Sequence, residues 1–198
     1  MKKFLMFALV AMVAGVAMAQ TLEGIANSYI YDVENDVWYQ GNGAGVWATG
    51  GAFQSHDFGI VDSLTLGGQA ATWQGGSPNT TATMFWEVFA GAVSQDSGSM
   101  NLAWLNNTGG GFGTDSTWEN VVGQDVAADL DPETEYTVAI WFNAVQTGTP
   151  DITVWDSNNS ANYIASFETA SAPIPEPATM SLLGLGALAM VLRRKMSK

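Results

Sequence analysis

Carboxylates are the most frequent side chains in this 198-residue chain that could bind an ion or transfer a proton. They gather in two segments, one with Asp32, Glu34 and Asp36 and the other with Asp125, Asp129, Asp131, Glu133 and Glu135. Calcium prefers oxygen ligands, so Asp129, Asp131 and Glu133 are weak candidates for a Ca²⁺ site. The segment lacks the central glycine and the twelfth-position acid of an EF-hand loop. The alternative is that these side chains point into solvent from a turn, and we expect no obligatory cofactor.

The single histidine, His56, offers a second possible chemistry. Ser55 and Asp57 flank it, but the side chains of adjacent residues diverge and cannot form a Ser-His-Asp triad. We therefore expect His56 to lie in a surface loop. Two carboxylates at a suitable separation could hydrolyse a glycosidic bond, but the sequence selects no such pair. We expect no catalytic residue and no enzyme activity, and a secreted glycan-active enzyme is the least favoured alternative.

Tryptophan gives the better indication of a binding function, because the chain has eight. Trp86 and Trp104 have aliphatic neighbours at alternate positions, so we expect both in the core. Trp141 and Trp155 alternate with polar residues instead, which makes them candidates for stacking against sugar rings. The alternative is that a loop or a second sheet covers these two side chains.

Short segments of β-branched and aromatic residues must position these side chains, since no long segment has apolar residues at helical spacing. The clearest covers residues 135–145, in which Tyr136, Val138, Ile140 and Phe142 share one face. Further strands are predicted at 28–33, 58–66, 71–74, 82–90, 99–105, 117–122, 151–155 and 163–169, with a turn at Gly67-Gly68. This pattern predicts an all-β fold for residues 20–172, an antiparallel two-sheet sandwich of the jelly-roll or Ig-like type.

One local motif supports the sandwich. Residues 130–136, Leu-Asp-Pro-Glu-Thr-Glu-Tyr, resemble the tyrosine corner of fibronectin type III and related Greek-key domains. The resemblance implies that Leu130 packs inward and that the Tyr136 hydroxyl donates a hydrogen bond to the upstream backbone.

Charge is distributed very unevenly. All six Lys and Arg residues lie in the two terminal segments, whereas residues 20–172 contain every Asp and Glu except Glu176. The carboxylates of this body must therefore be solvated, accept hydrogen bonds or bind a cation. Its negative field repels phosphates, so we expect neither nucleic acid nor anionic lipid headgroups as partners.

The amino-terminal segment has the three regions of a secretory signal peptide. Lys2 and Lys3 precede an apolar run over residues 4–16, and Ala17-Met18-Ala19 precedes Gln20. We predict a signal peptide over residues 1–19, cleaved between Ala19 and Gln20, with the Sec translocon and signal peptidase as partners. The alternative is an uncleaved anchor, for which the apolar run is short.

The carboxyl-terminal segment has three parts in a fixed order. Pro175-Glu176-Pro177 follows two residues after Pro173, residues 178–192 are apolar or small, and Arg193-Arg194-Lys195 comes next. As a helix, residues 178–192 would span roughly 22 Å, less than the hydrocarbon core of about 30 Å. We predict a short hydrophobic transmembrane helix with its basic end in the cytoplasm. The alternative is a plain anchor behind a proline-rich stalk.

This arrangement over residues 173–198 resembles the PEP-CTERM sorting signal of Gram-negative bacteria. The resemblance implies that Pro175, Glu176 and Pro177 form the recognition motif for exosortase, a membrane-embedded cysteine protease. It also implies that residues 178–192 cross the inner membrane transiently and that the basic cluster Arg193, Arg194 and Lys195 stops transfer. Such proteins reach the cell surface or the extracellular polysaccharide.

These observations together predict an exported protein of structural or adhesive type, sorted by exosortase and associated with exopolysaccharide. The alternative is a carbohydrate-binding module that uses Trp141 and Trp155, with or without Ca²⁺.

Overall fold

The computed structural model describes residues 22–41, 48–73, 80–108, 115–148 and 150–171. Its regular elements are all β-strands, which confirms the predicted class. In chain order they are β1 (Gly24–Asp32), β2 (Val37–Gln40), β3 (Gly51–Ala52), β4 (His56–Val61), β5 (Thr65–Trp73), β6 (Thr80–Ala90), β7 (Val93–Thr108), β8 (Asp115–Asp125), β9 (Glu135–Gln146), β10 (Ile152–Asp156) and β11 (Tyr163–Thr169).

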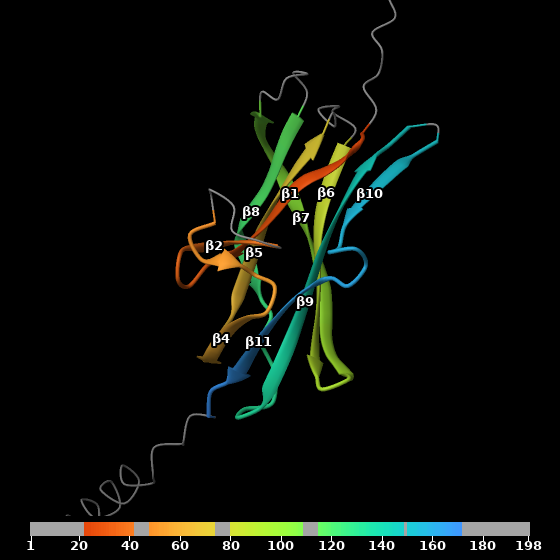
Figure 1. Cartoon of the computed structure of the whole chain (residues 1–198). Coiled ribbons are helices and arrows are strands. Elements are labelled where there is room, and N and C mark those ends of the chain that lie inside the picture. Colours follow the sequence, from red (N-terminus) through yellow and green to blue (C-terminus); the bar gives the residue numbers. More distant parts are fainter. Residues whose placement is uncertain (1–21, 42–47, 74–79, 109–114, 149, 172–198) are drawn as a thin grey trace, which may run out of the picture.

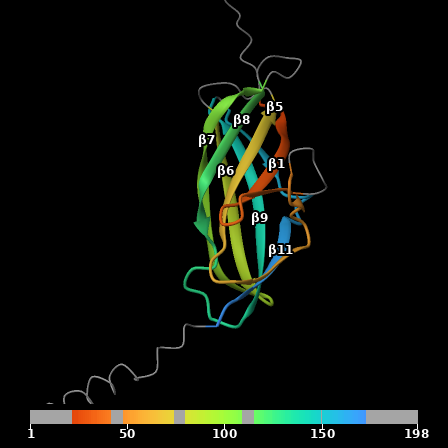
Figure 2. The same ribbon diagram turned by 90° about the vertical axis from the view of Figure 1, so that its left-hand side faces the viewer.

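The strands follow one hydrogen-bonded path in the order β3-β2-β1-β5-β8-β7-β6-β9-β11-β4, and β10 pairs with β9 off this path. Strand β7 joins the two halves of this path. Its first part, up to Leu102, pairs with β6, and its last part, from Ala103, pairs with β8. The result is a nearly closed, barrel-like sheet (Figures 1 and 2). Two separate sheets are therefore not confirmed, because one long strand continues through both halves.

Several strand boundaries differ from those predicted. The predicted strand at 58–66 is two strands, β4 and β5, and β4 pairs in parallel with β11. The predicted turn at Gly67-Gly68 is wrong, because both glycines lie inside β5. A Cβ on Gly68 would lie 2.6 Å from Met84 Sδ and 3.1 Å from a Phe142 ring carbon. Gly68 is thus required by close packing across the core and not by a turn.

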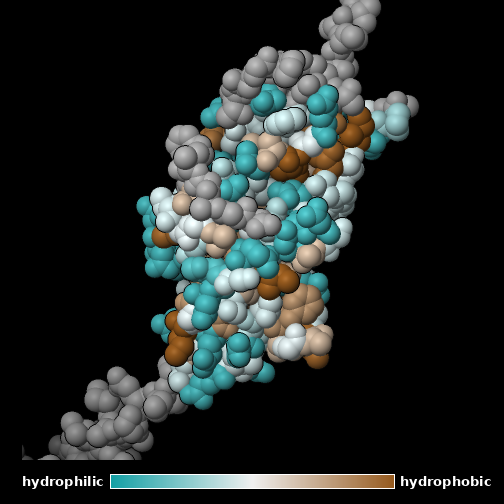
Figure 3. Space-filling model, viewed as in Figure 1, coloured by the Kyte–Doolittle hydropathy of each residue, from teal (hydrophilic) through white to brown (hydrophobic). Residues whose placement is uncertain are grey.

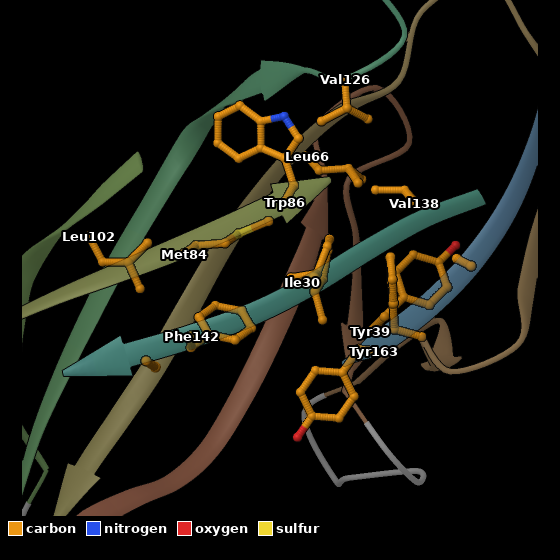
Figure 4. Packing of buried hydrophobic residues seen from close by; sticks show 14 of the residues in the cluster. Ile30, Tyr39, Leu66, Met84, Trp86, Leu102, Val126, Val138, Phe142 and Tyr163 are labelled. Atoms are coloured by element: carbon orange, nitrogen blue, oxygen red, sulfur yellow. The ribbon is translucent and has the colours of Figure 1, made fainter. Parts of the chain in front are cut away.

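The core lies between the two halves of the sheet (Figure 4). Strand β9 supplies Tyr136, Val138, Ile140 and Phe142 to it, as its alternating pattern predicts. Ile30 from β1 and Met84 from β6 pack in the same cluster, and all six side chains are buried. The alternating residues of β6 and β9 face away from this core and form an outer surface.

The two tryptophans predicted for the core have different environments. Trp86 is buried, as expected, but Trp104 is 56% exposed. Trp104 pairs with Trp118 of β8, next to a register shift between Trp104 and Asn106. The aliphatic neighbours of Trp104 gave a wrong prediction because β7 changes partner at this point and Trp104 falls outside the packed centre.

The side chain of Trp86 explains a glycine on the neighbouring strand. Gly98 lies opposite Trp86, and a Cβ there would lie 2.3 Å from Cζ2 of the indole. We expect Gly98→Ala to destabilise the fold by about 1–3 kcal/mol, because the buried ring must shift. Urea unfolding measures this change. Gly24→Ala is the matched control, since nothing lies within 4 Å of a Cβ at Gly24; equal losses for the two variants would refute the packing argument.

The tyrosine corner is present. Tyr136 donates its hydroxyl hydrogen to the Asp131 carbonyl at 3.3 Å, and Leu130 packs against the core. The hydroxyl of Thr169 donates to the same carbonyl at 2.6 Å, and the Glu133 amide donates to the Thr169 carbonyl at 3.0 Å. The corner therefore fixes the start of β9 and the end of β11 to one loop.

Candidate functional site

Three aromatic side chains meet on the outer surface of β6, β9 and β10. Phe85 lies opposite Trp141 in the register of β6 and β9, and their rings stack with centroids 5.6 Å apart and planes 5° apart. The centroids of Phe85 and Trp155 are 5.9 Å apart. Trp155 is 55% exposed, whereas Phe85 and Trp141 are half-buried. We call Phe85, Trp141 and Trp155 the outer aromatic cluster.

The structure thus brings together both tryptophans that the sequence singled out and adds Phe85, which sequence reasoning missed. Trp141 and Trp155 are on neighbouring antiparallel strands, where Trp155 lies opposite Asn143. Phe85 alternates with Thr83 and Glu87 on its strand, the same polar pattern that marked the tryptophans. That alternation predicts the outer facing of Phe85, but only the pairing of β6 with β9 places it beside the tryptophans.

Polar groups adjoin the cluster. Thr83 of β6 lies opposite the exposed Asn101 of β7, and its hydroxyl donates to Asn101 Oδ1 at 3.5 Å. Asn143 of β9 lies beneath this surface, where its buried Oδ1 has no hydrogen-bond partner among the described residues. Figure 3 shows a mostly hydrophilic surface on the side seen in Figure 1, with hydrophobic side chains in small separate groups. An aromatic surface bordered by amides and hydroxyls can stack a ring that carries hydroxyl groups.

The carboxylates considered for calcium are not arranged as a site. Asp129, Asp131 and Glu133 are exposed, and Asp129 and Glu133 have positive φ values of 60° and 53°. In the tyrosine corner, Asp131 accepts the hydrogen bond from Tyr136 with its backbone carbonyl and not with its carboxylate. Within the described ranges, no three His, Cys, Asp or Glu side chains are placed to hold a metal ion. Calcium binding stays a prediction without geometric support.

His56 is not in a loop, contrary to expectation. It begins β4 and packs against the rings of Tyr39 and Phe58, with centroid distances of 4.5 and 4.6 Å. Burial lowers the pKa of the imidazole, and the nearby carboxylates of Asp57 and Asp32 only partly oppose this. His56 is therefore a neutral packing residue near pH 7, and it joins the Tyr39 and Phe58 rings at one side of the core.

Comparison with known families identifies the carboxyl-terminal segment. The model of the PEP-CTERM protein-sorting motif matches residues 173–195. The chain carries a PEP-CTERM sorting motif. The match contains Pro175, Glu176 and Pro177 and the basic cluster Arg193, Arg194 and Lys195. No curated protein matches the chain.

The PEP-CTERM motif implies an exported protein that exosortase processes at the membrane, as the resemblance predicted. The motif lies outside the described residues, as do the predicted helix at 178–192 and the predicted signal-peptide cleavage site at Ala17, Ala19 and Gln20. The signal peptide stays a prediction. In the part of the chain that the structure describes, no helix has the length and hydropathy to cross a membrane.

The folded body extends almost to the PEP-CTERM motif. After β11, the Ala170 amide donates to the Val61 carbonyl at 2.8 Å, and the Ser171 hydroxyl donates to the Glu133 carboxylate. The match to the motif begins two residues later, at Pro173. The last described residues are thus bound to the β4 end and to the tyrosine-corner loop.

Between residues 20 and 172, where the sequence has no Lys or Arg, backbone amides serve as partners for some of the acids. Glu34 accepts hydrogen bonds from the Thr65 amide at 2.9 and 3.1 Å and from the Ser63 hydroxyl at 3.1 Å. Burial raises the pKa of Glu34, but these hydrogen bonds outweigh it and the pKa is lowered. Asp125 likewise accepts from the amides of Leu64 and Ala127. Such bonds stabilise single carboxylates but leave the mutual repulsion among them.

We expect the melting temperature of the exported protein to rise with added NaCl at pH 7. Between residues 20 and 172 no Lys or Arg opposes the carboxylates, so salt screens a repulsion that is not balanced. Thermal unfolding at low and moderate salt measures the trend. The rise should shrink near pH 4, where carboxylates begin to protonate. A melting temperature that stays constant or falls with salt at pH 7 would contradict this expectation.

Proposed function

We propose that the exported body is a non-catalytic component of the bacterial cell surface or extracellular matrix that binds neutral exopolysaccharide through the outer aromatic cluster. The observation that carries this proposal is the arrangement of Phe85, Trp141 and Trp155 on one outer surface. The PEP-CTERM motif supports export and processing at the membrane. The role is structural or adhesive, because the body would hold the polymer without changing it.

The chemistry of the cluster favours a sugar over other ligands. Indole and phenyl faces attract the C–H face of a pyranose ring, and nearby amide and hydroxyl groups exchange hydrogen bonds with its hydroxyls. Trp155 is the most accessible ring, and Trp141 is held in place by Phe85. Because Trp141 is already stacked, less of its side-chain entropy is lost on binding.

The charge of the body determines which class of polysaccharide it can bind. The body from 20 to 172 contains no Lys or Arg, so a uronate, sulfate or phosphate group finds no cationic partner there. The surrounding carboxylates repel such polymers at low salt. We therefore assign the cluster to neutral hexose polymers.

Affinity electrophoresis of the protein recovered from the cell exterior tests the proposal. Gels contain dextran, a soluble β-glucan, galactomannan or, as an anionic comparison, alginate. We expect retarded migration in at least one neutral polymer and none in alginate. In W141A/W155A we expect the apparent affinity to fall by about 5- to 150-fold, because two stacking contacts of about 0.5–1.5 kcal/mol each are lost.

Trp104→Ala provides the matched control, since Trp104 is as exposed as Trp155 but belongs to no described ring pair. The proposal fails if no neutral polymer retards the wild-type protein, or if the control and the double variant lose the same affinity. A panel of chromogenic glycosides tests the non-catalytic assignment in parallel, and turnover of any of them would overturn it.

A further inference from the structure

We propose that the body has a second sugar-binding site, a cleft lined by Tyr29, Trp38, Gln69 and Glu119, and that it thereby cross-links two segments of neutral polysaccharide. This inference rests on the proposed function and adds a second binding site to the one proposed there. The cleft lies on the other half of the sheet from the outer aromatic cluster, over β1, β2, β5 and β8. Its volume is about 210 Å³.

The sheet register builds the cleft. Tyr29 of β1 lies opposite Gln69 of β5, and Gln69 lies opposite Glu119 of β8. These three side chains therefore form one row across three strands and point to the same face. Strand β2 pairs with β1 at the edge opposite to β5. Trp38 of β2 lies opposite Tyr31, whose side chain points to the same face of β1 as that of Tyr29.

The polar side of the cleft suits hydroxyl groups. Gln69 Nε2 donates to Glu119 Oε2 at 2.7 Å, which fixes the orientation of both groups. The amide oxygen of Gln69 and the second carboxylate oxygen of Glu119 then serve as adjacent acceptors for neighbouring sugar hydroxyls. Hydrogen bonds to a charged acceptor are stronger than those between neutral groups.

The aromatic side of the cleft is preorganised. The rings of Trp38 and Tyr31 stack with centroids 4.6 Å apart and planes 28° apart. The Tyr31 hydroxyl in turn donates to the Asp36 carboxylate at 2.7 Å. The stack on Tyr31 therefore restricts the Trp38 indole, which lines the cleft, so less side-chain entropy is lost when a sugar ring stacks on it.

The character of the cleft excludes other ligand classes. A single carboxylate does not form a divalent cation site, and among the described residues no group of three acidic or histidine ligands is arranged for a metal. Glu119 repels anions, and the body offers no Lys or Arg to attract them. The combination of a supported indole, an amide and a carboxylate matches a neutral sugar.

The two sites face in different directions. Gly68 of β5 approaches Met84 of β6 and Phe142 of β9 across the core, so the two halves of the sheet pack through their inner faces. Gln69 points to the opposite side of β5 from Gly68, and Phe85 points to the opposite side of β6 from Met84. Their outer faces therefore point away from each other, and one body can hold two polymer segments at once.

The experiment compares four forms of the protein recovered from the cell exterior: wild type, W141A/W155A, W38A/Q69L and the combination of all four substitutions. Affinity electrophoresis in the retarding neutral polymer reports binding, and the viscosity of the same polymer solution reports cross-linking. We expect either double variant to retain retardation with about tenfold lower apparent affinity and to lose the viscosity increase. The quadruple variant should show neither effect.

Each variant is first compared with wild type by thermal unfolding, and Trp73→Ala, an exposed tryptophan outside both sites, is the control.

The outcomes separate the two proposals. If W141A/W155A binds nothing while wild type binds, the cleft is not a site and the proposed function stands. If W38A/Q69L raises viscosity as much as wild type does, the cross-linking role is overturned. If W141A/W155A keeps full affinity and W38A/Q69L loses it, the cleft is the site and the cluster is not. If wild type is never retarded, both proposals fail.

Discussion

Replacing Pro175, Glu176 and Pro177 with alanines is expected to abolish the processed form of the protein outside the cell. These residues lie within the match to the PEP-CTERM motif, which exosortase processes. The full-length tail should then stay attached, and the protein should accumulate in the membrane fraction.

Intact-mass measurement of the exterior and membrane fractions checks this result. In the wild type, the exterior species should lack the carboxyl-terminal segment and, if the predicted signal peptide is removed, should begin at Gln20. Pro150→Ala is the control, because this proline lies in the loop between β9 and β10, outside the motif. An alanine-motif variant that appears outside the cell with the wild-type mass would refute the role of the motif.

Phe142→Ala is expected to lower the free energy of unfolding by about 3–5 kcal/mol, more than Gly98→Ala does. Phe142 is fully buried at the centre of β9, where its ring approaches Gly68 of β5 from across the core. Alanine would leave a cavity between the two halves of the sheet, and neither half can close it because their separation is set by neighbouring side chains. A domain with a total stability of about 5–15 kcal/mol would lose a large part of it.

Urea unfolding of the exported protein measures this loss. Phe89→Ala is the matched control. The side chain of Phe89 points to the opposite side of β6 from the buried Met84, away from the core, and it is only half-buried. We expect a clearly smaller change for the control. If both variants lose the same free energy of unfolding, the core does not lie between β5 and β9 as described.

Features encoded within one strand or one loop could be predicted from the sequence. The alternation of Tyr136, Val138, Ile140 and Phe142 identified the buried face of β9, and the same alternation placed Trp141 on the outer face. The Leu130–Tyr136 segment identified the tyrosine corner, which depends on a hydrogen bond between residues five positions apart. Local periodicity and local hydrogen bonding are visible in the order of the residues.

Features that depend on which strands meet could not be predicted. Phe85 joins the two tryptophans only because β6 pairs with β9 in one register. Gly68 resembles a turn residue in the sequence, yet the reason for it is that a Cβ there would lie too close to Met84 on another strand. The exposure of Trp104 follows from the change of partner along β7. Each of these results from contacts between distant residues, which composition and spacing do not record.

The bound end of β11 limits how far the PEP-CTERM motif can lie from the folded body. Four peptide units separate Ser171 from Pro175, so the tether from the body to the motif spans roughly 14 Å at most. Strand β11 ends at the opposite end of the body from the start of β1 (Figure 1). Exosortase, which processes the motif, must therefore reach its substrate beside the end of the body formed by β11, β4 and the tyrosine-corner loop.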